Sequence, residues 1–251
     1  MNEKDSSEAK SLGALVTQYR PKRGYSRINR ITAFVVGIPG IVLLIAGIVL
    51  TFRDRTYICL PIFGLAGIGA GLLSYRLGQR QRGFRVSIHE KGLSFEQSGL
   101  TDVFRWDHIT DIKKNVQRNS RGRVSGLSYT VTADHGRQLS FDHNTIANAD
   151  ELGMHIQRQV ANHKLPEAVS ACRAGETLSF GPLSANDEGI ARGDETLPWE
   201  RVGSIELNNQ RLIIKEVGEK GNWARIDVSR VPNYYLFLSL GTTLSELAKD
   251  E

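Results

Sequence analysis

The chain has 251 residues, of which 24% are charged and 40% are hydrophobic, and its formal net charge is +5. These averages are typical of a soluble protein, but the basic residues gather at one end: residues 1–82 hold 12 Lys and Arg against 4 Asp and Glu, whereas residues 83–251 hold 20 against 23. The two cysteines, Cys59 and Cys172, are far apart, which excludes a secreted disulfide-stapled protein and gives no Cys/His cluster for a metal.

Two long apolar runs follow the basic N-terminal segment. Residues Ile31 to Phe52 and Tyr57 to Tyr75 carry no charged side chain, and only four residues separate the runs. Each is close to the ~20 residues that a helix needs to cross a bilayer, whereas core helices of soluble proteins and the apolar part of a signal peptide are shorter. We therefore predict a two-helix transmembrane hairpin over residues 31–76.

Positive residues flank both runs on the side of the termini. By the positive-inside rule, both termini face the cytoplasm, which predicts a multi-pass protein of the cell (plasma) membrane. Residues 1–30 are then a cytoplasmic, partly disordered segment. The membrane-flanking residues are Lys22, Arg23, Arg27, Arg30, Arg76, Arg80 and Arg82.

Small residues recur at helical spacing in the second run, where Gly64, Gly67 and Gly71 lie on one face. Such spacing lets two helices approach closely. Two interpretations stay open: the hairpin packs against itself through these glycines, or they form a face for a second molecule. With no charged group inside either run, we do not expect the hairpin to transport ions or protons.

The remaining chain contains two similar stretches. Trp106, Ile109 and Ile112 recur at the same spacings as Trp199, Val202 and Ile205, and the segment FDHNTIAN (141–148) matches IDVSRVPN (226–233). The repeat predicts two tandem cytoplasmic domains over residues 83–165 and 170–251, with both tryptophans in hydrophobic cores.

Alternation of apolar and polar residues predicts strands in the first copy at 85–89, 93–97, 102–105, 109–117, 127–133 and 138–141. A helix follows, with Asn148 as N-cap, Glu151 completing a capping box, and an end near His163. The second copy ends similarly, with Asn233 as cap and a helix with leucines on one face. Its polar run from Asn186 to Gly193 predicts strands less clearly.

This order of strands, a Trp-x-x-[Ile/Val]-x-x-Ile motif and a closing amphipathic helix, on the cytoplasmic side of a two-span hairpin, resembles the pleckstrin-homology-like domains of uncharacterised bacterial membrane proteins. The opening Leu12–Pro21 resembles the start of one such family, a domain of unknown function. The resemblance implies a membrane α-helical hairpin joined to an α+β, mainly β, part: two tandem bent antiparallel sheet domains, each capped by a C-terminal helix.

Motifs for catalysis, metal or cofactor binding are missing from the polar part of the sequence, so we predict a non-enzymatic protein without cofactor. We expect a module that binds a protein partner or itself. The alternative function is anionic lipid headgroup binding through a basic loop, and nucleic-acid binding is not expected because the polar part is net acidic. The possible lipid or partner contacts are Lys113, Lys114, Arg118, Arg121 and Arg123.

Overall fold

The computed structural model describes residues 11–22, 25–53, 59–80, 84–97 and 100–250. The chain divides into two compact units, which are treated separately below. Unit 1 comprises Met1–Glu90, Ser94–Val103 and Asn144–Ala147, and unit 2 comprises Lys91–Leu93, Phe104–His143 and Asn148–Glu251. The prediction of disorder at the N-terminus falls on residues 1–10, outside the described residues.

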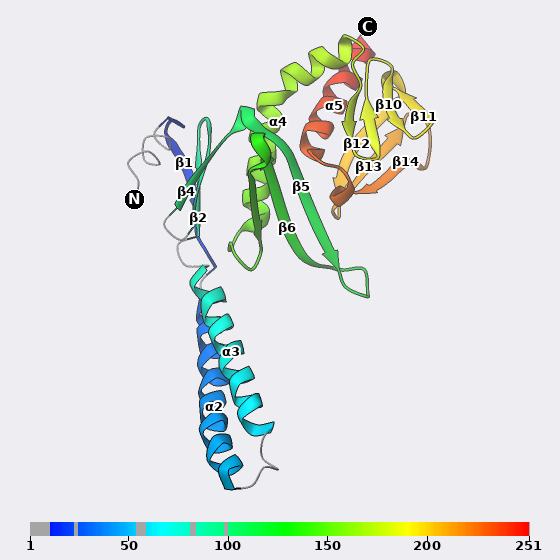
Figure 1. Ribbon diagram of the computed structural model, residues 1–251. Coiled ribbons are helices and arrows are strands. Elements are labelled where there is room, and N and C mark those ends of the chain that lie inside the picture. The colour runs from blue at the N-terminus through cyan, green and yellow to red at the C-terminus, as the bar shows by residue number, and fades with distance from the viewer. Residues whose placement is uncertain (1–10, 23–24, 54–58, 81–83, 98–99, 251) are drawn as a thin grey trace. The chain divides into compact units, whose positions relative to one another are not determined.

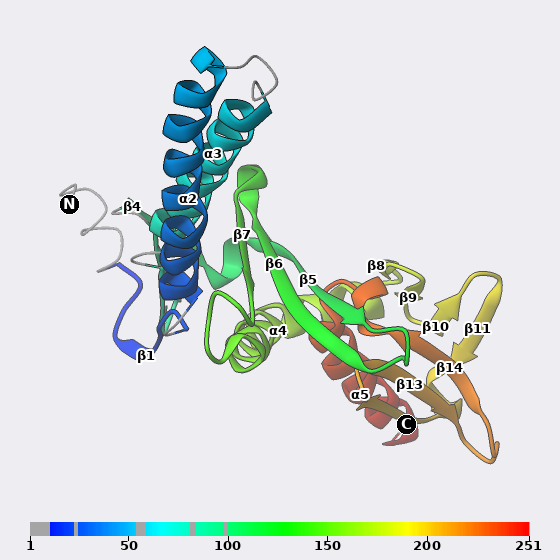
Figure 2. The ribbon, with the colours of Figure 1, turned by 90° about the horizontal axis from the view of Figure 1, so that it is seen from below.

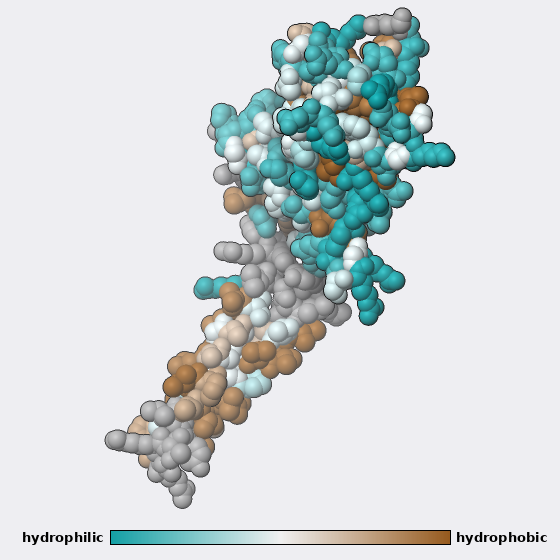
Figure 3. Space-filling model, turned by 90° about the vertical axis from the view of Figure 1, so that its right-hand side faces the viewer, coloured by the Kyte–Doolittle hydropathy of each residue, from teal (hydrophilic) through white to brown (hydrophobic). Residues whose placement is uncertain are grey.

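Unit 1 contains the two predicted apolar helices, α2 (Tyr25–Arg53) and α3 (Cys59–Arg80), which lie side by side (Figure 1). Their segments Ile31–Phe52 and Cys59–Arg76 are each long and apolar enough to span a bilayer, and only 11% of each is buried. Apolar side chains cover their outer surface, as Figure 3 shows in brown. The connection between the helices lies outside the described residues.

Glycines form the contact between α2 and α3. A Cβ atom added at Gly71 would lie 2.9 Å from the Cα of Gly37, and one at Gly64 would lie 2.5 Å from the backbone nitrogen of Leu44. Gly67 faces Gly40 in the same way, at 3.1 Å. Of the two interpretations of this spacing, the structure therefore supports packing of the hairpin against itself, since no larger residue fits between the two backbones.

The hairpin is inserted into a β-sheet. Strand β1 (Leu15–Tyr19) precedes α2, and β2 (Arg85–His89) follows α3, yet the two pair antiparallel with Tyr19 opposite Val86. With β3 (Gly92–Gln97) and β4 (Leu100–Arg105) they form a sheet of order β1-β2-β3-β4. Residues 15–19 were predicted to lie in a segment outside the domains, because a pairing across so long an insertion leaves no local pattern in the sequence.

The first part of unit 2 is a three-stranded sheet, β5 (Ile109–Arg118), β6 (Val124–Ala133) and β7 (Gln138–Asp142), with the helix α4 (Ala149–Arg173) packed against it. These strands and those of unit 1 confirm the alternation-based prediction. The side chain of Asn148 makes no bond to the helix backbone and instead donates to Glu151 Oε2 at 2.9 Å. Asn148 therefore has the predicted N-cap position of α4, but the side-chain bond to the helix backbone that a capping box requires is not made.

Helix α4 is also longer than predicted, because it continues past Pro166 to Arg173. Proline removes one backbone donor, but Ala168 and Cys172 beyond it are buried in the core of the following strands. The helix ends in a Schellman turn, in which the N–H of Glu176 donates to Ala171 O and that of Gly175 to Cys172 O. The boundary expected between residues 165 and 170 thus lies inside a continuous helix.

The second part of unit 2 has a four-stranded sheet of order β11-β10-β9-β8 and a three-stranded sheet of order β12-β13-β14, closed by α5 (Tyr234–Asp250). The remaining bounds are β8 (Leu178–Phe180), β9 (Leu183–Ala185), β10 (Gly189–Arg192), β11 (Glu195–Pro198), β12 (Val202–Asn208), β13 (Arg211–Glu216) and β14 (Asn222–Asp227). Strand β10 therefore forms within the polar run from Asn186 to Gly193.

Trp106 and Trp199 occupy matching places. Each opens a short 3-10 helix, η2 (Trp106–His108) and η4 (Trp199–Arg201), just before a three-stranded sheet, and each is buried, as predicted. The first strand of each sheet also carries an irregularity at the same distance from the tryptophan, between Ile109 and Asp111 in β5 and between Val202 and Ser204 in β12.

Candidate functional site: the joint around Arg118

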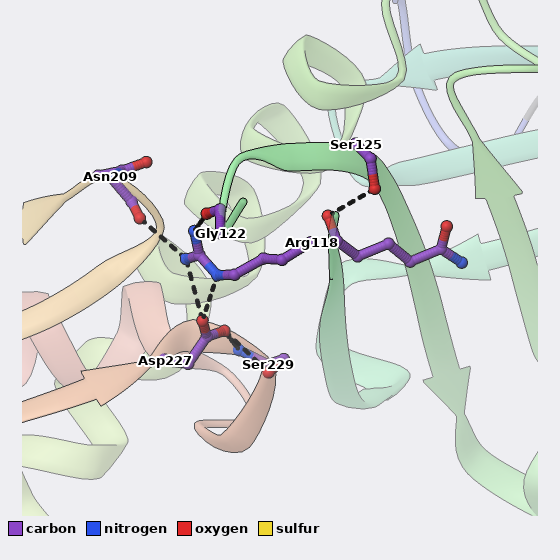
Figure 4. A network of polar contacts seen from close by, with 7 residues as sticks. Arg118, Gly122, Ser125, Asn209, Asp227 and Ser229 are labelled. Carbon is purple, nitrogen blue, oxygen red and sulfur yellow. Dashed lines mark hydrogen bonds and ion pairs between the residues drawn. The ribbon is translucent and has the colours of Figure 1, made fainter. Parts of the chain in front are cut away.

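Arg118, at the end of β5, connects the two parts of unit 2. Its Nη2 donates to Asp227 Oδ2 at 3.1 Å and to Asn209 O at 3.2 Å, and its Nη1 donates to Gly122 O at 3.3 Å (Figure 4). The guanidinium is a rigid planar fork with five donors, so one side chain holds the β5–β6 hairpin, the β12–β13 turn and the end of β14 together. The tip of the β5–β6 hairpin accordingly lies beside β14 in Figure 2.

Asp227 is held in place for this contact. Its other oxygen, Oδ1, accepts from the backbone N–H of Ser229 at 3.1 Å and from the Ser229 hydroxyl at 2.8 Å. Burial by itself would raise the pKa of Asp227, but the bonds from Ser229 and Arg118 outweigh it and lower the pKa below its usual value. Asp227 is thus ionised at neutral pH, and the pair with Arg118 is charged.

Asn233 binds the outer edge of β5. Its Oδ1 accepts from Ile112 N–H at 3.0 Å, its Nδ2 donates to Thr110 O at 3.1 Å, and its backbone N–H donates to Ile112 O at 3.0 Å. The residue has φ +50°, a left-handed conformation that asparagine adopts more readily than most residues. The sequence pattern predicted Asn233 as a helix cap, whereas its side chain satisfies a neighbouring strand.

The two helices are linked as well. Arg158 on α4 donates to the hydroxyl of Tyr235 on α5 at 3.0 Å, and its guanidinium lies 5.6 Å from the centre of the Tyr235 ring. We call the contacts made by Arg118, Asp227, Asn233, Arg158 and Tyr235 the module joint. Its residues come from β5, β14, α4, α5 and the residue directly before α5, so it fixes the position of one part of unit 2 against the other.

A second polar cluster lies between α4 and the sheet. The Lys114 side chain is 1% exposed, and its Nζ donates to Asp150 Oδ1 at 2.7 Å. The Tyr129 hydroxyl donates to the same oxygen at 2.6 Å, and the ring of Tyr129 fits under α4 because residue 153 is glycine. Burial by itself would raise the pKa of Asp150, but the bonds from Lys114 and Tyr129 lower it by more, so the pKa lies below its usual value. This cluster is structural, since a buried charge requires its partner.

Cys172, the one cysteine of unit 2, is no candidate nucleophile. It lines a small pocket of about 200 Å³ with Trp199 and Leu244, among others. Burial, and then the charges of Asp187 and Glu176, raise its pKa to about 11, so the thiol stays protonated at neutral pH and lacks the reactivity of a thiolate. Among the described residues, no three His, Cys, Asp or Glu side chains are grouped as a metal ion would require.

The comparison with known families matches residues 1–249 to a family of unknown function, DUF6585. The chain belongs to this family. Its membership confirms the expected relation to an uncharacterised family that covers almost the whole chain. No curated protein matches the sequence. The bacterial source and the pleckstrin-homology-like fold implied by the resemblance stay predictions.

In this DUF6585 chain the five predicted contact residues have different roles. The side chain of Lys114 is buried and pairs with Asp150, and Arg118 belongs to the module joint. Lys113 is exposed and lies 3.0 Å from Asp111. Arg121 and Arg123 are exposed on the β5–β6 turn, where the side chain of Asn119 accepts from both of their backbone N–H groups at 3.0 Å. Asn119 was not among the predicted residues, although asparagine often accepts backbone N–H bonds in such turns.

Two of the seven membrane-flanking residues are described in full: Lys22 and Arg76 have exposed side chains. Arg27 and Arg30 lie in the first turns of α2, and Arg80 ends α3, but their side chains are outside the described residues. Arg23 and Arg82 are outside them altogether. Four of the seven lie in helices next to the apolar segments: Arg27, Arg30, Arg76 and Arg80. Their place at a membrane surface stays a prediction.

Proposed function

We propose that the chain is a non-enzymatic protein anchored in the cell membrane, in which two pleckstrin-homology-like copies form one module for binding a protein partner or a second copy of the chain. Two observations support the anchor: the outer surface of α2 and α3 is apolar, and basic residues precede α2 and follow α3. In a bilayer this surface would meet lipid, and the basic ends would remain in the cytoplasm.

The order of elements supports two copies of one fold. A four-stranded sheet, a buried tryptophan, a three-stranded sheet and a helix follow one another twice along the chain. In the second copy, β8 and β9 are joined by the two residues Gly181 and Pro182, with Phe180 opposite Leu183. In the first copy the same connection, from Tyr19 to Val86, contains the hairpin. The anchor is then an insertion in the first turn of the first copy.

The module joint carries the proposal for an interaction role. Isolated β-rich domains on a chain usually move independently, but here Arg118 binds Asp227 and Asn233 binds β5. The charged groups at this place are used to hold one part of unit 2 against the other. A fixed arrangement of the two parts of unit 2 presents a single, preformed surface, which lowers the entropy cost of binding a partner.

Capture of proteins from native membranes tests this role. The wild-type chain is compared with the joint variant Arg118→Ala/Asn233→Gly and with Arg121→Ala, which changes an exposed arginine of the same turn. A partner that recognises the fixed arrangement is recovered with the wild type and with Arg121→Ala, and its yield falls with the joint variant. All three chains stay in the membrane pellet after carbonate extraction. Release of the wild-type chain by carbonate, or equal capture by all three, contradicts the proposal.

Anionic lipid binding is the second candidate, supported by the exposed side chains of Arg121 and Arg123. Each cation near an anionic surface contributes about 1 kcal/mol, so these two arginines together contribute about 2 kcal/mol. Flotation with anionic and neutral liposomes distinguishes the candidates. Lipid binding requires the wild-type chain to float better with anionic vesicles and Arg121→Ala/Arg123→Ala to lose this preference.

A further inference from the structure

The outer edge of β5 is satisfied by the second half of the same chain. In an antiparallel ladder, every second residue of an edge strand directs its N–H and C=O away from the sheet. Ile112 is such a residue, and both of its backbone groups bond to Asn233, as does the carbonyl of Thr110. One asparagine thus takes the place of a neighbouring strand over three backbone groups.

Strand β12 also has an outer edge with outward backbone N–H and C=O groups, and in the described part of the chain these groups have no hydrogen-bond partner. Gly203 and Ile205 follow Trp199 at the distances at which Thr110 and Ile112 follow Trp106. The two-residue turn Asn209–Gln210 makes Asn208 and Arg211 the first hydrogen-bonded pair of the hairpin, so the alternation directs the N–H and C=O of Ile205 outward. In the described part of the chain no strand pairs with this edge of β12, and no hydrogen bond reaches the outward groups of Gly203 and Ile205.

The residue that matches Asn233 is Asn148. It closes FDHNTIAN as Asn233 closes IDVSRVPN, and each directly precedes a helix. Asn148 is exposed, and within the part of the chain that the structure describes its side chain makes a single hydrogen bond, to Glu151. Charge also favours contact between unlike halves, because residues 83–166 hold 11 Lys and Arg against 9 Asp and Glu, whereas residues 167–251 hold 9 against 14.

We propose that a second copy of this chain docks with its Asn148 on the outer edge of β12, where its side chain repeats between molecules the two side-chain bonds that Asn233 makes with β5 within one molecule. This proposal rests on the interaction role proposed above and names the partner. The two surfaces in contact differ, so each docked pair of molecules leaves one free Asn148 and one free β12 edge. Such a contact extends into an open row of molecules unless it closes into a ring.

Sedimentation velocity of the full-length chain in detergent micelles, over a range of protein concentrations, tests the proposal. The wild-type chain associates as its concentration rises. Asn148→Ala removes the docking side chain and weakens association at least tenfold, whereas Asn162→Ala, an exposed asparagine farther along α4, leaves it unchanged. A single-cysteine pair in a background without Cys59 and Cys172 gives a second measurement that keeps Asn148: chains with Ala147→Cys, an exposed residue next to Asn148, and chains with Gly203→Cys, mixed, form a heterodimer with a short bis-maleimide.

A wild-type chain that stays monomeric at every concentration overturns the proposal. Association that Asn148→Ala does not weaken also overturns it, because the contact then lies elsewhere, for example between the hairpins. Neither result affects the membrane anchor or the capture of a different protein by the module. Failure of this proposal is therefore distinct from failure of the proposed function.

Discussion

Replacing Asn233 is the sharpest test of how the two parts of unit 2 are held together. In Asn233→Gly the left-handed backbone is retained, but Ile112 N–H and Thr110 O lose their partners. The first group is partly buried and the second is exposed to water, so we expect a loss of about 2 kcal/mol in the free energy of unfolding. Asn233→Ala loses the same bonds and adds about 1 kcal/mol, because alanine is disfavoured at φ +50°.

All three tryptophans, Trp106, Trp199 and Trp223, belong to unit 2, so thermal unfolding followed by tryptophan fluorescence reports on this unit. A change of 1 kcal/mol shifts the midpoint by about 2–4 °C in a domain of this size, which gives about 4–8 °C for Asn233→Gly. Amide exchange at Ile112 should accelerate in parallel. Asn148→Ala, the control at the matching position, should shift the midpoint by less than about 2 °C because its side chain makes one exposed bond.

Two results would refute this reasoning. If Asn233→Gly unfolds at the temperature of the wild type, the bonds to β5 do not hold the parts of unit 2 together. If Asn148→Ala is as destabilised as Asn233→Gly, the loss reflects the start of a helix and not the edge of β5.

Three further regions give predictions. In the hairpin, Gly71→Leu should lower the SDS concentration at which helicity is lost, since a Cβ there meets α2, whereas Gly69→Leu should not, since a Cβ there meets nothing within 4 Å; equal effects would contradict the glycine contact. In unit 2, Asp150→Ala leaves the buried Lys114 unpaired and should lower the free energy of unfolding by about 3 kcal/mol. Lys114→Met should lower it by about 1 kcal/mol or less, because the Asp150 side chain is 41% exposed and can be hydrated. Urea titrations measure both losses. Since the folded-state pKa of Asp150 is depressed, its contribution is present above pH ~4 and is lost as the pH falls through the folded pKa, so Asp150→Asn should show a shallower loss of stability on acidification. Replacement of residues 20–85 by Gly-Pro, the β8–β9 connection, should give a chain that stays in solution without detergent and keeps the wild-type tryptophan spectrum; a precipitated or unfolded product would show that the hairpin is not a simple insertion.

Local patterns in the sequence determined much of the secondary structure. Alternation placed β2, β5, β6 and β7 within a few residues, because a strand with one buried face must alternate. The apolar runs predicted α2 and α3, and the recurring Trp106 and Trp199 predicted two buried core positions. Each of these features depends on residues that are neighbours along the chain.

The tertiary structure decided the rest. That β1 pairs with β2 across the hairpin, that α4 continues past Pro166, and that Asn233 binds β5 depends on residues far apart in the sequence. The cations of the basic loop show the same limit: charge alone groups Lys114 and Arg118 with Arg121, but burial makes one an internal ion pair and the second a link to Asp227. The sequence alone does not distinguish a charged side chain that is hydrated from one that pairs with a carboxylate far along the chain. The difference depends on how separate elements pack together.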